Sequence, residues 1–209
     1  SAASDVYKRQ QPGCVVIKHA NPCGAAVSDN VYDSFLKALN ADRLSAFGGI
    51  VALNRECTTE IAKELSDFFI EIIVAPSFTK ESLEIFSSKK NLRVIELVSL
   101  DGFNDKTSVR NINGGLLLQE TDTFTVDAKS LKIVTDSKIS PNTYGTIEFG
   151  WTVLKYIKSN GILIVKNNAT LGVGAGQVSR VDSVDIAITK ASGDIKDSIL
   201  LSDAFFQFR

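Results

Sequence analysis

Short apolar runs that alternate with helix-patterned segments are the feature that most constrains the fold of this chain. Each run spans four to six residues and is followed by a segment whose apolar residues recur at three- and four-residue spacing. The runs lie at residues 14–17, 50–53, 72–75 and 92–97, and the helical patterns between them begin near Val31, Thr59 and Thr79. Such alternation predicts an α/β fold in which helices cover a mainly parallel sheet.

The second half of the chain repeats the pattern after a break. Residues 98–129 are rich in Asp, Asn, Thr and Gly, which favours a junction between two subdomains. Ser140 followed by Pro141 predicts a helix start, because a capping residue before proline is typical of helix N-termini. The remaining segments are predicted as a strand, a glycine-rich loop and a helix, at residues 162–165, at residues 171–176 and from Val178.

The charge balance and the cysteine pattern disfavour several classes of function. The 23 basic and 24 acidic side chains leave no charge excess for binding nucleic acid or an anionic membrane. No apolar run approaches the roughly 20 residues of a membrane span and no signal peptide is evident, so a cytoplasmic protein is expected. Cys14, Cys23 and Cys57 show no C-x-x-C spacing, which disfavours a disulfide framework. His19 is the only histidine, which disfavours a histidine-rich metal site.

The first apolar run ends at Lys18 and His19, which makes this pair a candidate for chemistry. In parallel α/β sheets, ligands bind at the edge where the strands end. Because an ammonium group disfavours a second positive charge beside it, the imidazole can accept a proton, while the ammonium group can stabilise an oxyanion. The alternative is structural, since a histidine beside a strand is often a hydrogen-bonded structural residue and a lysine at a strand end is often only solvated.

A zinc motif at the same place is incomplete. Nucleoside deaminases hold zinc through H-x-E followed later by P-C-x-x-C. His19 is followed by Ala20 and Asn21, so the glutamate is missing. Pro22-Cys23 is not followed by a second cysteine at the required place. A tetrahedral zinc site needs more ligands than this, so no metal is predicted.

Two glycine-rich segments favour close approach of a ligand or of the backbone. Gly48 and Gly49 precede the second apolar run, where a tight turn is the alternative. Residues 171–177 contain G-x-G-x-G, which departs from the dinucleotide fingerprint G-x-G-x-x-G because Gln177 stands at the third glycine position. A nicotinamide-binding module is therefore the weaker alternative. An anion-binding turn stays open, with Arg180 just inside the following helix.

Asn160 and Arg180 are the remaining polar candidates. Asn160 follows a long helical pattern, where a helix-capping role is the alternative. Its amide offers both a donor and an acceptor, which suits holding an amide or an amine. Arg180 could bind a planar or anionic group, and a surface charge is its alternative.

Five separated blocks of the chain carry a resemblance to a known family. They are KHANPCGAA, SAFGGIVALNR, EIIVAP, SNGILIVKNNATLGVGAGQVSR and SDAFFQFR, at residues 18–26, 45–55, 71–76, 159–180 and 202–209. In this order they resemble the AICAR transformylase part of the bifunctional purine-biosynthesis enzyme, the formyltransferase and IMP cyclohydrolase. The resemblance implies formyl transfer from the co-substrate 10-formyltetrahydrofolate to the 5-amino group of AICAR, giving FAICAR, with no metal and no tightly bound cofactor.

The resemblance also assigns roles to individual residues. It implies that His19 takes a proton from the amine of AICAR and that Lys18 stabilises the charge that develops on the formyl oxygen. By the same resemblance, Asn160 is catalytic and holds the carboxamide and amine region beside the histidine. The family's substrate-binding positions fall on Gly48, Glu71, Arg180, Val181 and Phe205.

The resemblance finally implies an architecture and a partner. The family pairs two three-layer subdomains of cytidine deaminase-like type, so residues 11–128 are expected to form the first and residues 129–209 the start of the second. Residues 1–10 are interpreted as a non-native leader, and the chain as a fragment without the cyclohydrolase domain. Because the family forms its active site across a homodimer, weak or absent turnover is expected of the fragment. A non-catalytic nucleotide-binding or dimerisation fragment is the alternative.

Overall fold

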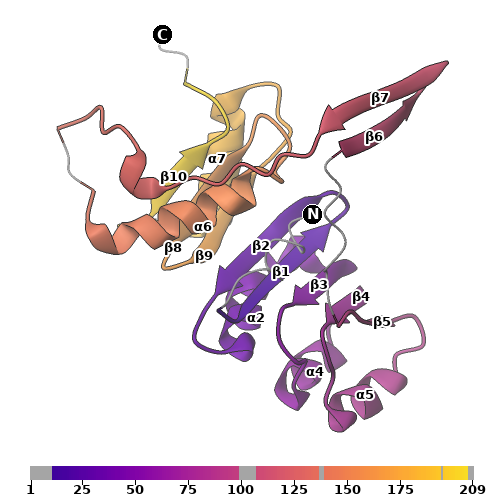
Figure 1. The fold of residues 1–209 in the computed structure, drawn as a ribbon. Coiled ribbons are helices and arrows are strands. Elements are labelled where there is room, and N and C mark those ends of the chain that lie inside the picture. Colours follow the sequence, from indigo (N-terminus) through magenta and orange to yellow (C-terminus); the bar gives the residue numbers. More distant parts are fainter. Residues whose placement is uncertain (1–10, 99–106, 137–138, 194, 207–209) are drawn as a thin grey trace.

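An eight-stranded sheet runs through the molecule and carries helices on both faces (Figure 1). The computed structural model describes residues 11–98, 107–136, 139–193 and 195–206. The strands of this sheet, in spatial order, are β10 (Ile199–Ser202), β8 (Ile162–Lys166), β9 (Ala169–Gly174), β2 (Asn21–Val27), β1 (Gly13–Lys18), β3 (Gly49–Leu53), β4 (Ile70–Ala75) and β5 (Arg93–Glu96). The α/β class expected from the sequence is confirmed. The expected leader, residues 1–10, lies outside the described residues.

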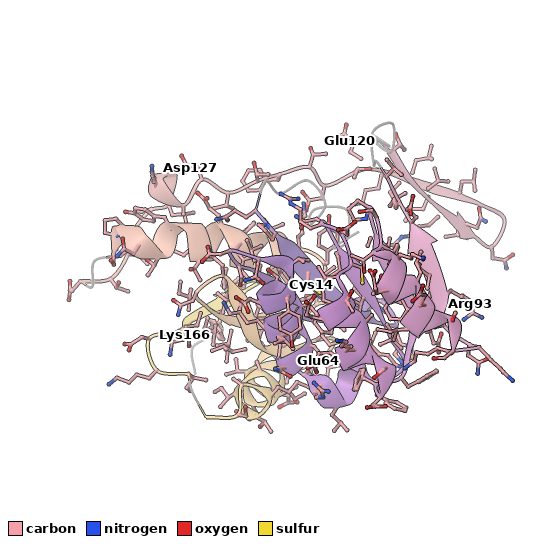
Figure 2. All side chains as sticks on the ribbon, turned by 90° about the horizontal axis from the view of Figure 1, so that it is seen from below. Cys14, Glu64, Arg93, Glu120, Asp127 and Lys166 are labelled. Carbon is pink, nitrogen blue, oxygen red and sulfur yellow. The ribbon has the colours of Figure 1, made fainter. Side chains whose placement is uncertain are left out.

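The helices divide between the two faces. One face carries α2 (Val31–Asn40), α4 (Thr59–Ser66), α5 (Lys80–Ser87) and α7 (Arg180–Lys190), and the other carries α6 (Tyr144–Leu154). Side chains alternate along β1, so Cys14 and Val16 enter the core with Phe35 of α2, whereas Val15 packs with Phe149 of α6. Cys14 accordingly lies well inside the molecule in Figure 2. The remaining short helices are α3 (Arg43–Ala46) and two 3-10 turns, η1 (Ala128–Ser130) and η2 (Pro141–Thr143).

Capping residues fix where several helices begin. Asn30 Oδ1 accepts a hydrogen bond from the Asp33 N–H at 2.8 Å at the start of α2. Thr79 Oγ1 accepts from the Ser82 N–H at 3.2 Å at the start of α5, as its position in the sequence predicts. The predicted start at Ser140 is also confirmed, because this residue precedes η2, which runs directly into α6.

The sheet is mixed, not mainly parallel. The pairs β3–β4 and β4–β5 are parallel, as the alternation of strands and helices predicts. The pairs on the other side of β3 are antiparallel. One cause is β2, which the sequence pattern did not predict. A two-residue turn at His19 and Ala20 folds β2 back along β1, and such a hairpin makes the pair antiparallel.

Small residues explain why β2 and β9 escaped prediction. Gly, Ala and Pro are poor strand formers, so neither segment carries a strand signal. Both strands lie under a helix at very close range. A Cβ on Gly24 would lie 1.8 Å from the Ala38 carbonyl oxygen of α2, and one on Gly172 would lie 2.0 Å from that of Ala187 in α7. Most of the predicted glycine-rich loop at residues 171–176 is therefore a strand that packs closely against a helix.

A hairpin projects away from the sheet (Figure 1). It consists of β6 (Thr107–Ile112) and β7 (Gly115–Glu120), which pair only with each other. The turn is Asn113-Gly114, with Gly114 at φ 79°, a dipeptide that favours tight hairpins. Both strands are exposed along their whole length, and Glu120 lies at the periphery in Figure 2. The junction expected at residues 98–129 thus contains a hairpin.

One continuous sheet joins the two segments that were assigned to separate subdomains. β9 pairs with β2 at Ala169 and Ala26, and the Val27 N–H donates to the Asn168 carbonyl at 2.9 Å. Helix α6 from the second segment packs on β1 and β2 from the first. The division into two cytidine deaminase-like subdomains stays a prediction. Among the described helices, none combines the length and the apolar character that crossing a membrane requires.

Candidate functional site

Lys18 ends β1 and reaches the turn that precedes β3. Its Nζ donates to the Phe47 carbonyl at 2.8 Å and to the Gly48 carbonyl at 3.0 Å. Gly48 has φ 69°, and a Cβ on it would lie 2.8 Å from Lys18 Nζ. Glycine is therefore favoured here by the backbone conformation, and a side chain would also displace the flexible end of Lys18. The structure thus brings together Lys18 and Gly48, which the sequence analysis singled out separately.

His19 occupies the turn between β1 and β2 with φ 55°. Residues other than glycine rarely adopt this left-handed conformation, and strained positions of this kind cluster at functional sites. The side chain is exposed. An exposed imidazole next to Lys18 is accessible to a ligand, and this position does not fit a buried structural histidine.

Asn160 and Arg180 form the second part of the site. Arg180 Nη2 donates to Asn160 Oδ1 at 2.6 Å, and its Nη1 donates to Ser202 Oγ at 2.9 Å. The same Nη1 forms an ion pair with Asp203. Asn160 Nδ2 donates to the Gln177 carbonyl at 2.9 Å. These contacts connect the segment before β8, the start of α7 and the end of β10.

The structural alternatives for these two residues do not hold. The Arg180 side chain is only 14% exposed, so it is not a solvated surface charge. Asn160 does not cap α6, because that helix ends at Leu154. Burial raises the pKa of Asp203, but hydrogen bonds from Ser159 and Arg180 outweigh burial and hold this pKa below its ordinary value. An ionised Asp203 therefore holds the guanidinium group in place at neutral pH.

A cavity of about 360 Å³ lies beside Lys18 and reaches Gln177, the hydrogen-bond partner of Asn160. Lys18 and Asn21 line it from the β1–β2 hairpin, and Gln177, which binds Asn160, lines it from the turn after β9. Asn21 Oδ1 also accepts from the Lys158 N–H at 3.0 Å, which ties the hairpin to the segment before β8. Small-molecule sites commonly enclose about 300–1,000 Å³, so the cavity suits a small ligand.

Lys18 is the one predicted site residue in this lining. The others lie outside it, namely His19, Gly48, Glu71, Asn160, Arg180, Val181 and Phe205. Glu71 is exposed on β4, two residues after Phe69, whose carbonyl accepts from the Gly48 N–H at 2.8 Å. Val181 in the first turn of α7 is 64% exposed, and Phe205 after β10 is 79% exposed. Their side chains are open to solvent, and their assignment to substrate binding stays a prediction.

Three polar residues of the site were missed by the sequence analysis. Asn21 and Asp203 lie inside blocks that were quoted for the resemblance, so closer attention to polar residues within those blocks would have found them. Lys190, which also lines the cavity, lies at the far end of α7. No local pattern relates Lys190 to Lys18, because only the packing of α7 against the sheet brings them to the same cavity.

The site offers groups for proton transfer and charge stabilisation. His19 presents an imidazole and Lys18 an ammonium group, while Asn160 and Arg180 present a planar array of donors and acceptors. Cys23 also lines the cavity, but burial raises the pKa of its thiol to about 11, so it is a weak nucleophile at neutral pH. Within the described residues, no group of three or more His, Cys, Asp and Glu side chains is arranged to hold a metal ion.

Comparison with known proteins extends the resemblance to nearly the whole chain. The AICARFT/IMPCHase bienzyme family matches residues 1–190. The bifunctional purine biosynthesis protein PurH of Thermoanaerobacter sp. (strain X514) is 43% identical over 199 residues, which are 95% of this chain and 39% of that protein. PurH proteins of Anoxybacillus flavithermus (strain DSM 21510 / WK1) and Bacillus cereus (strain B4264) are 44% and 41% identical, over 94% and 99% of the chain. The chain spans 38% to 40% of the length of these relatives.

Proposed function

Because the chain belongs to the AICARFT/IMPCHase bienzyme family, we propose that it carries the formyl-transfer site of a bifunctional purine-biosynthesis enzyme. In this reaction a formyl group moves from 10-formyltetrahydrofolate to the 5-amino group of AICAR, giving FAICAR. The observation that carries the proposal is a cavity that Lys18 lines on one side and Gln177, whose carbonyl binds Asn160, lines on another. A cytoplasmic location, with neither nucleic acid nor membrane as partner, belongs to the same proposal.

In the proposed mechanism, His19 acts as the general base. The amine nitrogen of AICAR attacks the formyl carbon, His19 accepts the amine proton, and the folate nitrogen leaves with a proton returned by the imidazole. A positioned general base typically contributes about 10²- to 10⁴-fold in rate. The strained turn supports this role, because it presents the imidazole at the end of the β1–β2 hairpin, next to the lysine.

Lys18 is proposed to stabilise the negative charge that develops on the formyl oxygen. An ammonium group has three N–H donors, and the carbonyls of Phe47 and Gly48 take two of them. The third is left to donate to the formyl oxygen. Because the two carbonyls already orient the ammonium group, little reorganisation is needed when negative charge develops.

Asn160 and Arg180 are proposed to orient the substrate. The guanidinium group occupies one lone pair of Asn160 Oδ1, which leaves the other for an amine N–H of AICAR. Gly48, Glu71, Val181 and Phe205 complete the proposed substrate contacts by resemblance to the family. The proposal also retains two cytidine deaminase-like subdomains, at residues 11–128 and 129–209, with ring closure assigned to a part of the enzyme outside this sequence.

A second copy of the chain is the proposed macromolecular partner. On one face of the β6–β7 hairpin, cross-strand pairing gathers apolar side chains that are each more than half exposed, namely Val109, Leu116 and Leu118. An isolated two-stranded hairpin is only marginally stable in water, and a contiguous apolar face marks an interaction site. A homodimer, which the resemblance implies, would cover this face.

Ligand binding and product analysis test the proposed function. Calorimetry should show that the native chain binds AICAR and that Asn160→Ala loses this binding. The matched control Asn142→Ala, at an exposed residue of η2, should bind AICAR as the native chain does. Formylation is followed by chromatography of FAICAR in the presence of 10-formyltetrahydrofolate, with His19→Ala as the inactive variant. Supplying FAICAR and measuring IMP separates ring closure from formyl transfer.

The outcomes separate the competing functions. Absence of heat at millimolar AICAR, together with absence of FAICAR, contradicts the proposal. Formation of IMP from FAICAR without formylation of AICAR assigns the other family activity to this segment. Binding of AICAR without turnover, when the full-length enzyme with His19→Ala still forms FAICAR, is the result expected of a non-catalytic nucleotide-binding fragment.

A further inference from the structure

Asp42, between α2 and α3, uses its two carboxylate oxygens for different elements. Oδ1 accepts from the Ser45 N–H at 3.0 Å and so caps α3. Oδ2 forms an ion pair with Lys190 Nζ, at 2.7 Å, in the last turn of α7. Ser45 and Lys190 both line the cavity that Lys18 lines. A single carboxylate therefore connects two walls of the candidate site.

This carboxylate is largely shielded from water. The Asp42 side chain is 10% exposed and that of Lys190 is 37% exposed. Burial raises the pKa of Asp42, but the bonds from Lys190 and Ser45 outweigh burial and keep this pKa below its ordinary value. The carboxylate is thus largely shielded while the lysine side chain is partly exposed, so removing Lys190 leaves Asp42 with one fewer partner in a mostly dry place.

The capped helix leads directly to Lys18. α3 is a single turn, Arg43–Ala46, and so short a helix is not stable without contacts at its ends. The next two residues are Phe47 and Gly48, whose carbonyls hold Lys18 Nζ. Fixing the start of α3 therefore fixes the direction of the two carbonyls that orient the ammonium group.

The other oxygen of Asp42 leads to Arg180. Helix α7 begins at Arg180, which holds Asn160, and ends at Lys190, which holds Asp42. We propose that Asp42 is a positioning residue that couples Lys18, through α3, to α7 and its Arg180. Its structural role is independent of the reaction, whereas its effect on formyl transfer rests on the proposed function.

Competitive labelling of lysines measures the structural coupling without turnover. Trace acetic anhydride and mass spectrometry give the reactivity of each ammonium group, with exposed Lys63 as the internal standard. Asp42→Ala removes the cap and the ion pair, whereas Lys190→Met removes only the ion pair. Both variants are expected to weaken the hydrogen bonds from Lys18 Nζ to the Phe47 and Gly48 carbonyls. Because each such bond contributes about 0.5–1.5 kcal/mol, Lys18 labelling should rise by roughly three- to tenfold. The matched control Asp29→Ala, an exposed aspartate before α2, should leave Lys18 labelling unchanged.

A second lysine reports on folding in the same experiment. Lys89 Nζ donates to the carbonyls of Ser66 and Phe68 at 2.6 and 3.1 Å, so it gains reactivity when α4 and α5 unfold. Unchanged Lys18 labelling with Lys89 still protected, in both Asp42→Ala and Lys190→Met, overturns the inference. If Asp42→Ala also raises Lys89 labelling, that variant is partly unfolded and the test rests on Lys190→Met. Unchanged Lys18 labelling in Lys190→Met then overturns the inference.

Kinetics in the full chain that transfers the formyl group give the second readout. Asp42→Asn keeps a capping oxygen but loses the charge, and it should lower kcat roughly tenfold or more with little change in KM for AICAR. A change in KM alone contradicts a positioning role. Absence of formyl transfer in the native chain contradicts the proposed function but does not affect the labelling result. Failure of the proposed function can therefore be told apart from failure of the structural coupling.

Discussion

Gly48 is the residue at which backbone conformation and site chemistry meet. Its φ of 69° already disfavours a side chain, and the added methyl group of Gly48→Ala would lie 2.8 Å from Lys18 Nζ. We expect Gly48→Ala to lower the free energy of unfolding by about 1–3 kcal/mol. Urea unfolding measures the change. The matched control is Gly145→Ala, an open helical position in α6 that should gain about 0.5–1 kcal/mol. Equal effects at both positions would contradict this account.

Asp203 links the stability of the site to pH. Its folded-state pKa lies below the ordinary value, because hydrogen bonds from Ser159 and Arg180 outweigh burial. The stabilising contribution is therefore fully present above the unfolded pKa, about 3.9, and is lost as pH falls from there through the folded pKa. The native chain should thus exceed Asp203→Asn in stability most at neutral pH, and this difference should shrink below about pH 4. If urea unfolding shows the same difference in free energy of unfolding between the native chain and Asp203→Asn at pH 7 and at pH 3, the proposed role of ionised Asp203 is contradicted.

At the scale of elements, α7 depends on the absence of a side chain beneath it. A Cβ on Gly172 would meet the Ala187 carbonyl oxygen at 2.0 Å, which is backbone and cannot rotate away. Gly172→Ala should therefore destabilise the fold by roughly 2–4 kcal/mol, although alanine costs less entropy than glycine in a strand. It should also displace Arg180, which begins the helix. The control is Gly115→Ala on β7, where an added Cβ would make only an ordinary contact with Ile112 at 3.9 Å, and it should change stability by less than about 0.5 kcal/mol. Thermal unfolding of both variants checks the contrast.

The β1–β2 hairpin is the element on which the catalytic proposal depends. Its two-residue turn carries His19, its first strand ends at Lys18, and its second strand begins at Asn21. All three residues thus lie at one end of one hairpin. The sequence analysis expected Lys18 and His19 at the end of a parallel strand. They do follow the end of a strand, but that strand is central in the sheet and belongs to a hairpin.

For the whole molecule, the projecting hairpin predicts the oligomeric state. Val109, Leu116 and Leu118 share one face, whereas Gln119 lies on the other. Burying one leucine contributes about 1.5–3 kcal/mol, so Leu118→Glu should weaken a dimer at least about tenfold. Analytical ultracentrifugation should show the native chain and Gln119→Glu as dimers and Leu118→Glu as a monomer. A native chain that sediments as a monomer at all concentrations refutes the homodimer.

The sequence by itself determined the features that depend on neighbours along the chain. The cap at Thr79, the helix start at Ser140 and the parallel edge of the sheet at β3, β4 and β5 were predictable, because capping and hydrophobic periodicity act over a few residues. The candidate residues Lys18, His19, Asn160 and Arg180 came from local motifs and from the family resemblance.

Only the tertiary structure decided which segments become strands without a strand signal and which distant residues meet. β2 and β9 are strands because they pair with neighbouring strands, and their glycines let α2 and α7 pack closely on them. Lys18 and Lys190 line the same cavity because α7 packs on the sheet, and Asp42 joins Lys190 to the start of α3 because a buried carboxylate needs both a donor and a cation. Packing and charge pairing act between neighbours in space, and no pattern along the sequence records them.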